Sequence, residues 1–179
     1  MIRAYLVTDP LDDAKSTRRY EIREKIFSLR DNYKVKDELD QDVFIVRSKL
    51  LTMGDNMILE DMTGNGLVKI EEELLHLNPT YKILSTRNDD AGRQLALVKK
   101  KFSLHETFSI DSVYGEYKLE ALDLLGRLFT LIKEGHIVAT VSRKYDTVAD
   151  AYEAEIDGNE DHALIIALII IISQSLGYY

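Results

Sequence analysis

Two short basic clusters are the residues in this sequence whose types could bind a ligand. Lys99, Lys100 and Lys101 are consecutive, and Arg143 and Lys144 form a basic pair further along. Ammonium and guanidinium groups attract phosphates and other anions, so a patch uniting these residues could hold an anion or a lipid headgroup. In a strand, Lys99 and Lys101 share one face and Lys100 takes the other. The candidate site is therefore Lys99, Lys101, Arg143 and Lys144; the alternative is that all four are solvated strand ends.

Catalytic and metal chemistry find little support in the sequence. None of the four histidines has metal-binding spacing, and we expect surface or capping roles for them. They are His76, His105, His136 and His162. Gly64 and Gly66 lack the third glycine of a phosphate-binding loop, and no serine lies in a nucleophile elbow. The chain has no cysteine, which excludes thiolate chemistry. We expect no catalytic residue, no metal and no cofactor, and so a protein that is not an enzyme.

Composition restricts the partners and the location. The 179 residues suit one domain, and 31 acidic against 23 basic side chains give a net charge of −8. That charge opposes unassisted binding to nucleic acid or to anionic lipid, although a local basic patch could still act. The apolar stretch at residues 1–10 is too short for a signal peptide. We expect a cytoplasmic protein, or one attached peripherally to a membrane, with no nucleic acid partner.

The segments that carry the basic residues alternate in polarity. Tyr20 and Ile22, for example, alternate with Arg19, Glu21 and Arg23. A period of two is typical of half-buried strands. Asn65-Gly66 is typical of a hairpin turn. The pattern predicts twelve strands, near residues 18–26, 33–36, 43–49, 57–62, 68–74, 81–86, 95–101, 107–111, 116–122, 128–133, 137–144 and 151–156.

The strands also repeat. A corner sequence recurs three times at a spacing of 24 residues, as Lys25-Ile26-Phe27-Ser28, Lys49-Leu50-Leu51-Thr52 and Glu73-Leu74-Leu75-His76, and a shorter version begins at Lys101. One unit would be two strands joined by a hairpin. The alternative is the approximate repetition of any antiparallel meander, but the shared corner sequence favours a true repeat.

An apolar run at residues 163–172 ends the patterned part of the chain. A membrane span needs about 20 apolar residues, and this run is too short. Its isoleucines favour a strand, but its length favours a helix. We predict a helix at about residues 160–176, capped by Asp157 or Asn159, with Glu160 and Asp161 in its first turn and Gly177 at its end.

A helix that is apolar on every side must be surrounded by protein. Twelve tilted strands would close into a barrel about 24 Å across, which leaves room for one helix. We therefore predict a mainly β fold, a closed twelve-stranded antiparallel barrel around a central hydrophobic helix. Residues 18–179 would form this single domain, after an irregular arm at residues 1–17.

The sequence resembles a known family. The residues that carry the resemblance are Lys25-Ile26-Phe27-Ser28-Leu29-Arg30-Asp31-Asn32-Tyr33, Lys-Lys-Phe-Ser at 100–103 and Asn159-Glu160-Asp161. They are similar to the pattern of the LURP-one-related family of bacteria and plants, over residues 18–176. That family is similar to the tubby C-terminal domain and the phospholipid scramblases, which implies the same barrel. Tubby domains bind phosphoinositide headgroups, but none of their binding residues can be matched here.

Three functions are compatible with these observations. The preferred one is a non-enzymatic binding or scaffold module whose partner is a lipid headgroup, another anion or a protein. The second is a membrane-associated, phospholipid scramblase-like protein, against which the net charge and the short apolar run count. The third is a hydrolase with an unrecognised site, against which the missing catalytic motifs count.

Overall fold

The computed structural model describes residues 16–25, 31–48, 56–101, 107–123, 127–144 and 150–176, and these contain twelve strands and one helix. The strands are β1 (Arg18–Glu24), β2 (Asp31–Asp37), β3 (Asp42–Ser48), β4 (Asn56–Asp61), β5 (Gly66–Glu72), β6 (Thr80–Ser85), β7 (Gln94–Lys101), β8 (Thr107–Ser112), β9 (Gly115–Ala121), β10 (Leu128–Lys133), β11 (His136–Lys144) and β12 (Ala151–Ile156), and the helix is α1 (His162–Leu176). The predicted irregular arm lies almost entirely outside the described residues and stays a prediction.

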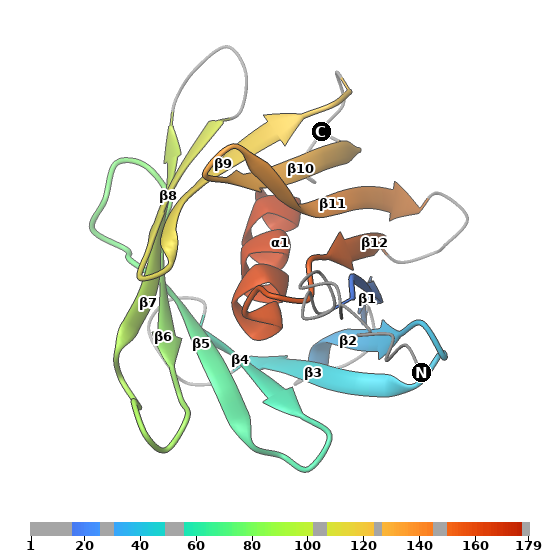
Figure 1. The fold of residues 1–179 in the computed structure, drawn as a ribbon. Helices are drawn as coiled ribbons and strands as arrows, with labels where there is room; N and C mark the ends of the chain where they lie inside the picture. The colour runs from blue at the N-terminus through green and yellow to red at the C-terminus, as the bar shows by residue number, and fades with distance from the viewer. Residues whose placement is uncertain are drawn as a thin grey trace, which may run out of the picture.

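The strands form one closed antiparallel barrel. Each strand pairs with its neighbours in the chain, and β1 closes the ring by pairing with β12, from Arg18 opposite Ile156 to Arg23 opposite Ala151. Figure 1 shows α1 inside this ring. The predicted fold is therefore confirmed.

Alternation along the strands builds the core. On β1, Tyr20 and Ile22 are buried, whereas Arg19 and Glu21 lie on the outer face. Every α1 residue from Leu164 to Ile172 has an exposed fraction of 0%. This burial on all sides outweighs the weak helix propensity of isoleucine. Among the described residues, no helix has the length and apolarity needed to cross a bilayer.

The start of α1 differs from the prediction. The helix begins at His162, two residues late, and its first turn holds no acidic side chain. Asp157 does not cap it, because its carboxylate accepts the N–H of Asn159 (2.8 Å) and so forms the preceding turn. Asp161 is the cap instead: its Oδ1 accepts the N–H of Leu164 at 3.2 Å. Gly177 lies outside the described residues.

Two other local predictions also change. The hairpin between β4 and β5 exists, but its positive φ belongs to Gly64 (87°) and not to the Asn65-Gly66 pair. Gly66 is needed for space, since a Cβ there would lie 2.8 Å from Thr86 Oγ1. β5 ends at Glu72, so Leu74 belongs to the following loop and not to a strand. Of the four repeated corner sequences, only the one at residues 73–76 lies wholly within the described residues.

The barrel has two distinct ends. Even-numbered strands finish, and odd-numbered strands start, at the end where α1 begins, which we call the entry end. The opposite end, where α1 finishes, is the exit end. Lys99, Lys101, Arg143 and Lys144 all lie near the exit end, because β7 and β11 run in the same direction.

Candidate functional site

Asp161 links the start of α1 to the barrel wall. Its carboxylate accepts two hydrogen bonds from the Arg87 guanidinium, at 2.8 and 3.0 Å, and one from the Tyr114 hydroxyl at 3.3 Å. Its side chain is only 12% exposed. Burial alone would raise the pKa of Asp161, but the Arg87 ion pair and the Leu164 N–H hold that pKa below its usual value. The carboxylate therefore stays charged and fixes the helix start.

Glu160 makes a second link beside the first. Its carboxylate forms an ion pair with Lys133 at the end of β10 and accepts a 2.6 Å hydrogen bond from the Tyr117 hydroxyl of β9. The Lys133 ammonium also lies 5.5 Å from the centre of the Tyr117 ring. Burial, together with the hydrogen bond to Glu160, raises the pKa of Tyr117, so its hydroxyl keeps the proton that it donates.

His162 makes a third link, to β1. Its Nε2 lies 3.1 Å from the carbonyl oxygen of Asp157, and its Nδ1 lies 2.7 Å from the Tyr20 hydroxyl. A carbonyl only accepts, so Nε2 carries the proton and Nδ1 accepts from Tyr20. Burial lowers the pKa of His162, which favours this neutral form.

These three links give the entry end a structural role. Their charged and polar groups face each other, and together they join α1 to β1, β9, β10 and the loop after β6. The sequence placed His162 near the start of the predicted helix, but it indicated none of the partners of this residue. No spacing rule could have found them, because Arg87 and Asp161 are 74 residues apart in the chain.

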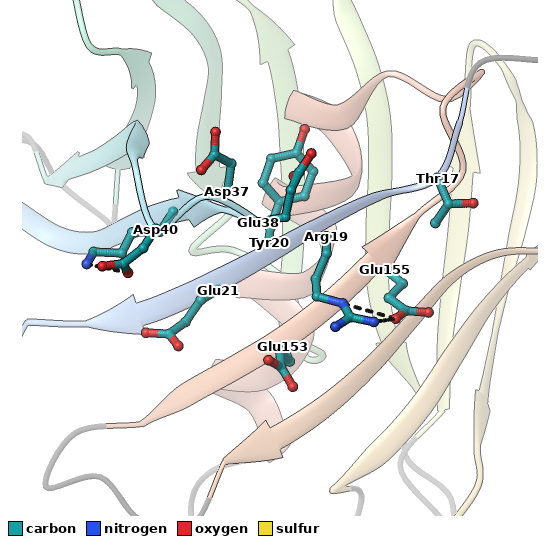
Figure 2. Close-up of a pocket in the computed structure, with 10 residues that line it drawn as sticks. Thr17, Arg19, Tyr20, Glu21, Asp37, Glu38, Asp40, Glu153 and Glu155 are labelled. Atoms are coloured by element: carbon teal, nitrogen blue, oxygen red, sulfur yellow. Dashed lines mark hydrogen bonds and ion pairs between the residues drawn. The ribbon is translucent and has the colours of Figure 1, made fainter.

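An open groove of about 680 Å³ runs along the outer face of β1, also near the entry end. It is lined by Thr17, Arg19, Tyr20, Glu21, Lys36, Asp37, Glu38, Asp40, Glu153 and Glu155. Figure 2 shows Arg19 and Glu155 turned toward each other, and Arg19 Nε donates to Glu155 Oε1 at 3.1 Å. Lys36 pairs with Asp40 at 2.7 Å. The groove is acidic, but its charges are largely engaged in pairs.

At the exit end, β7 divides its three lysines as alternation predicts. Lys100 points inward, and its ammonium donates to the carbonyl oxygen of Ser175 at 3.2 Å, where the helix dipole favours a cation. Lys99 and Lys101 are exposed on the outer face, opposite Ser109 and Thr107 of β8. Among the described residues, neither has a carboxylate in ion-pair range.

Arg143 and Lys144 lie at the same end but in different surroundings. Arg143 is opposite the buried Tyr152, so it faces inward, and it pairs with the carboxylate of Asp150. Lys144 faces outward and pairs with Glu21 (2.6 Å) and Glu153 (3.3 Å). Three strands separate β11 from β7, which corresponds to about 19 Å along the wall at about 4.8 Å per strand. The structure thus brings Lys99 and Lys101 together, but not all four residues.

Metal ligands do not gather in the part of the chain that the structure describes, where no three His, Asp or Glu side chains form a group that could hold an ion. His76 is exposed and pairs with Glu73 at 2.7 Å. His136 is exposed at the start of β11. His105 lies outside the described residues.

Comparison with known proteins agrees with this architecture. A model of the LURP-one-related family matches residues 18–173. The chain belongs to the LURP-one-related family. One relative, named uncharacterized protein YxjI, from Bacillus subtilis (strain 168), is 27% identical over 156 residues, covering 87% of this chain and 91% of YxjI.

A solved structure shows the same fold in a plant protein. An X-ray structure of a protein from Arabidopsis thaliana is similar to this chain with a TM-score of 0.64, at 18% identity, over 90% of this chain and 93% of the other. At this identity the match establishes the barrel with its central helix and nothing about a ligand. The function of this LURP-one-related chain must therefore be argued from its own side chains.

Proposed function

We propose that this LURP-one-related chain is a non-enzymatic binding module that binds an anionic group at the exit end, through Lys99 and Lys101 of β7. The observation that carries the proposal is the contrast among the cations. Lys99 and Lys101 are exposed and have no carboxylate partner among the described residues, whereas Arg87, Lys133 and Arg143 each have one. Two ammonium groups on alternate positions of one strand face can attract a single phosphate or phosphodiester.

The packing of the barrel supports binding over catalysis. Side chains of α1 fill the interior, where Leu164 to Ile172 are fully buried. At the entry end, Asp161 pairs with Arg87, Glu160 pairs with Lys133, and the His162 ring accepts a hydrogen bond from Tyr20, so these groups are engaged in contacts within the protein. The same packing supports a binding module over a scramblase-like protein that would release α1 into lipid, because release would expose the apolar inner face of the barrel wall to water.

Arg143 and Lys144 have a secondary role in this proposal. An anion that reached Arg143 would compete with Asp150, and one that reached Lys144 would compete with Glu21 and Glu153. Breaking these pairs costs part of the attraction that the new contact supplies. We therefore expect Lys99 and Lys101 to contribute most of the binding energy.

The test uses the full-length chain and charge-reversal variants. Binding of inorganic phosphate, of soluble glycerophosphate headgroups and of phosphatidylserine vesicles is measured at two salt concentrations, which separates free phosphate from lipid headgroup as the ligand. Lys99→Glu with Lys101→Glu should abolish binding, and Arg143→Glu with Lys144→Glu should weaken it less. The matched control is Arg93→Glu with Lys118→Glu, two exposed cations elsewhere, which should bind as the wild type does. Wild-type binding by the first variant would refute the proposal.

A further inference from the structure

Three leucines are exposed on the loop between β5 and β6. Leu75 is 99% exposed and Leu77 is 98% exposed, with Leu74 at 58%. Single exposed leucines are ordinary, but three within four positions of one loop form a concentrated apolar tip. Nothing in the described part of the fold covers them.

Hydrogen bonds hold the base of this loop in place. The Glu73 N–H donates to the Thr80 carbonyl at 2.8 Å, and the Thr80 hydroxyl donates to the Asn78 carbonyl at 3.0 Å. The Glu73 carboxylate pairs with His76 (2.7 Å) and with Lys82. The leucines thus point outward from a loop whose base is held by hydrogen bonds and whose acidic residue, Glu73, is engaged in pairs.

The leucine loop lies next to the two exposed lysines. The Lys100 N–H donates to the carbonyl oxygen of Pro79 at 3.0 Å, which joins the loop to β7. Thr80, the first residue of β6, is the register partner of Lys99. Exposed apolar side chains therefore share one edge of the exit end with two exposed cations that have no carboxylate partner among the described residues.

We propose that this edge docks on the surface of a bilayer that contains anionic lipids. The leucines of the loop (Leu74, Leu75 and Leu77) enter the region between headgroups and acyl chains, while Lys99 and Lys101 bind phosphate groups above it. The lysine part of this proposal rests on the proposed function, and the leucine part does not.

A bilayer fits the edge better than a protein surface does. The leucines stand out from the barrel at the tip of a loop, which suits entry into a fluid apolar layer. The neighbouring cations match the negative potential of such a layer. Each inserted leucine should strengthen binding about tenfold, and each lysine near the surface about fivefold. The combination explains how a chain with a net charge of −8 can approach anionic lipid.

Vesicle sedimentation of the full-length chain tests the docking. Wild-type protein should pellet with vesicles of phosphatidylcholine mixed with phosphatidylserine, and much less with phosphatidylcholine alone. Leu75→Ser with Leu77→Ser should lower the vesicle affinity about 100-fold without changing binding to soluble glycerophosphate. The matched control is Leu39→Ser with Ile137→Ser, whose side chains are 72% and 61% exposed near the entry end, and it should bind vesicles normally. Unchanged thermal melts would show that each variant folds.

Insertion can be observed directly because the chain has no cysteine. Leu75→Cys carrying an environment-sensitive fluorophore should shift to the blue and brighten on anionic vesicles. The same label at Leu39→Cys should not respond.

The outcomes separate this docking from headgroup binding. If Leu75→Ser with Leu77→Ser binds vesicles like the wild type while Lys99→Glu with Lys101→Glu does not, docking by the leucines is refuted and headgroup binding stands. If Lys99→Glu with Lys101→Glu binds phosphate normally but Leu75→Ser with Leu77→Ser no longer binds vesicles, the proposed anion site is refuted. Insertion of the leucines into the bilayer then stands. Failure of the wild type to bind any vesicle overturns the docking, and a protein surface becomes the partner of the leucines.

Discussion

The entry and exit ends of the barrel use charged residues in opposite ways. At the entry end, Glu160 and Asp161 are partly buried and paired with Lys133 and Arg87, in direct contact with the start of the helix. At the exit end, Lys99 and Lys101 remain exposed without such partners in the described structure. A charge that is paired and buried holds the fold together, whereas an exposed and unpaired charge remains available for a ligand.

β7 shows the same difference within three residues. Lys100 faces inward and satisfies a carbonyl oxygen at the end of α1, while its neighbours Lys99 and Lys101 face outward. Side-chain alternation alone places one lysine at the end of the helix and two on the outer face, where we propose that they bind an anion. Experiments that remove charges at each end, or the helix between them, can test this division.

Removing the helix should have the largest effect. A chain cut after Asp157 loses α1, together with the three side chains that link it to the barrel wall, those of Glu160, Asp161 and His162. Each buried leucine or isoleucine deleted from a core costs about 2–5 kcal/mol, and a domain of this kind is stable by about 5–15 kcal/mol. Circular dichroism should therefore show an unfolded or aggregated chain without a cooperative melt.

Leu168→Asp is a control for the truncation, because it disrupts the packing of α1 in a chain of full length. It buries an unpaired charge at a fully buried position, so it should be nearly as damaging. A cooperative, wild-type-like melt of either protein would mean that α1 does not support the barrel.

Breaking one entry-end ion pair should have an intermediate effect. Arg87→Met leaves Asp161 buried without its cation and should lower the free energy of unfolding by about 2–3 kcal/mol at pH 7. Lys99→Met with Lys101→Met at the exit end should stay within about 0.5 kcal/mol of the wild type. Urea denaturation of both variants measures the contrast, and equal losses would remove the distinction between the two ends.

The loss caused by Arg87→Met should also depend on pH. The pKa of Asp161 is lowered in the folded protein, so its stabilising contribution is full above its unfolded pKa of about 4 and disappears as the pH falls through the lowered value. The difference between wild type and variant should therefore shrink as the medium is acidified below pH 4.

Titration of His162 should have the smallest effect. Because burial lowers its folded pKa, the unfolded chain binds the proton more readily, and stability falls as the pH drops below about 6.5. The slope from this one group is at most about 1.4 kcal/mol per pH unit. His162→Asn keeps an acceptor for Tyr20 but cannot titrate, so its stability should fall less between pH 7 and pH 5. Parallel curves of unfolding free energy against pH for the two proteins would show that His162 does not cause the loss of stability.

The barrel could be predicted from the sequence because each of its strands shows a local alternation of apolar and polar residues. Alternation of the kind seen at Tyr20 and Ile22 marks each wall strand, and an apolar helix of this length has no stable place in water except inside such a wall. The helix boundary was less predictable, because Asp157, Asn159 and Asp161 all have side chains that can cap. Only the turn that Asp157 forms decides among them.

The candidate site was predictable only in part. Alternation separated Lys99 and Lys101 from Lys100 correctly. It could not show that Lys144 meets Glu21, because a pair 123 residues apart depends on barrel closure. The exposure of Leu74 could not be predicted either, since an apolar residue that continues a period of two is ordinarily assigned to the core. Whether any of these residues binds a ligand stays a prediction.

The position of α1 after all twelve strands has a consequence for biosynthesis. Every inward-facing apolar side chain of the wall emerges from the ribosome before the helix that covers it. β1 also cannot complete its pairing until β12 has been synthesised, since Arg18 pairs with Ile156. Such distant contacts are slow to form, and the waiting strands expose edges and apolar faces. Nascent chains of this protein should therefore depend on chaperones that hold unfinished sheets apart until residues 162–176 have been synthesised.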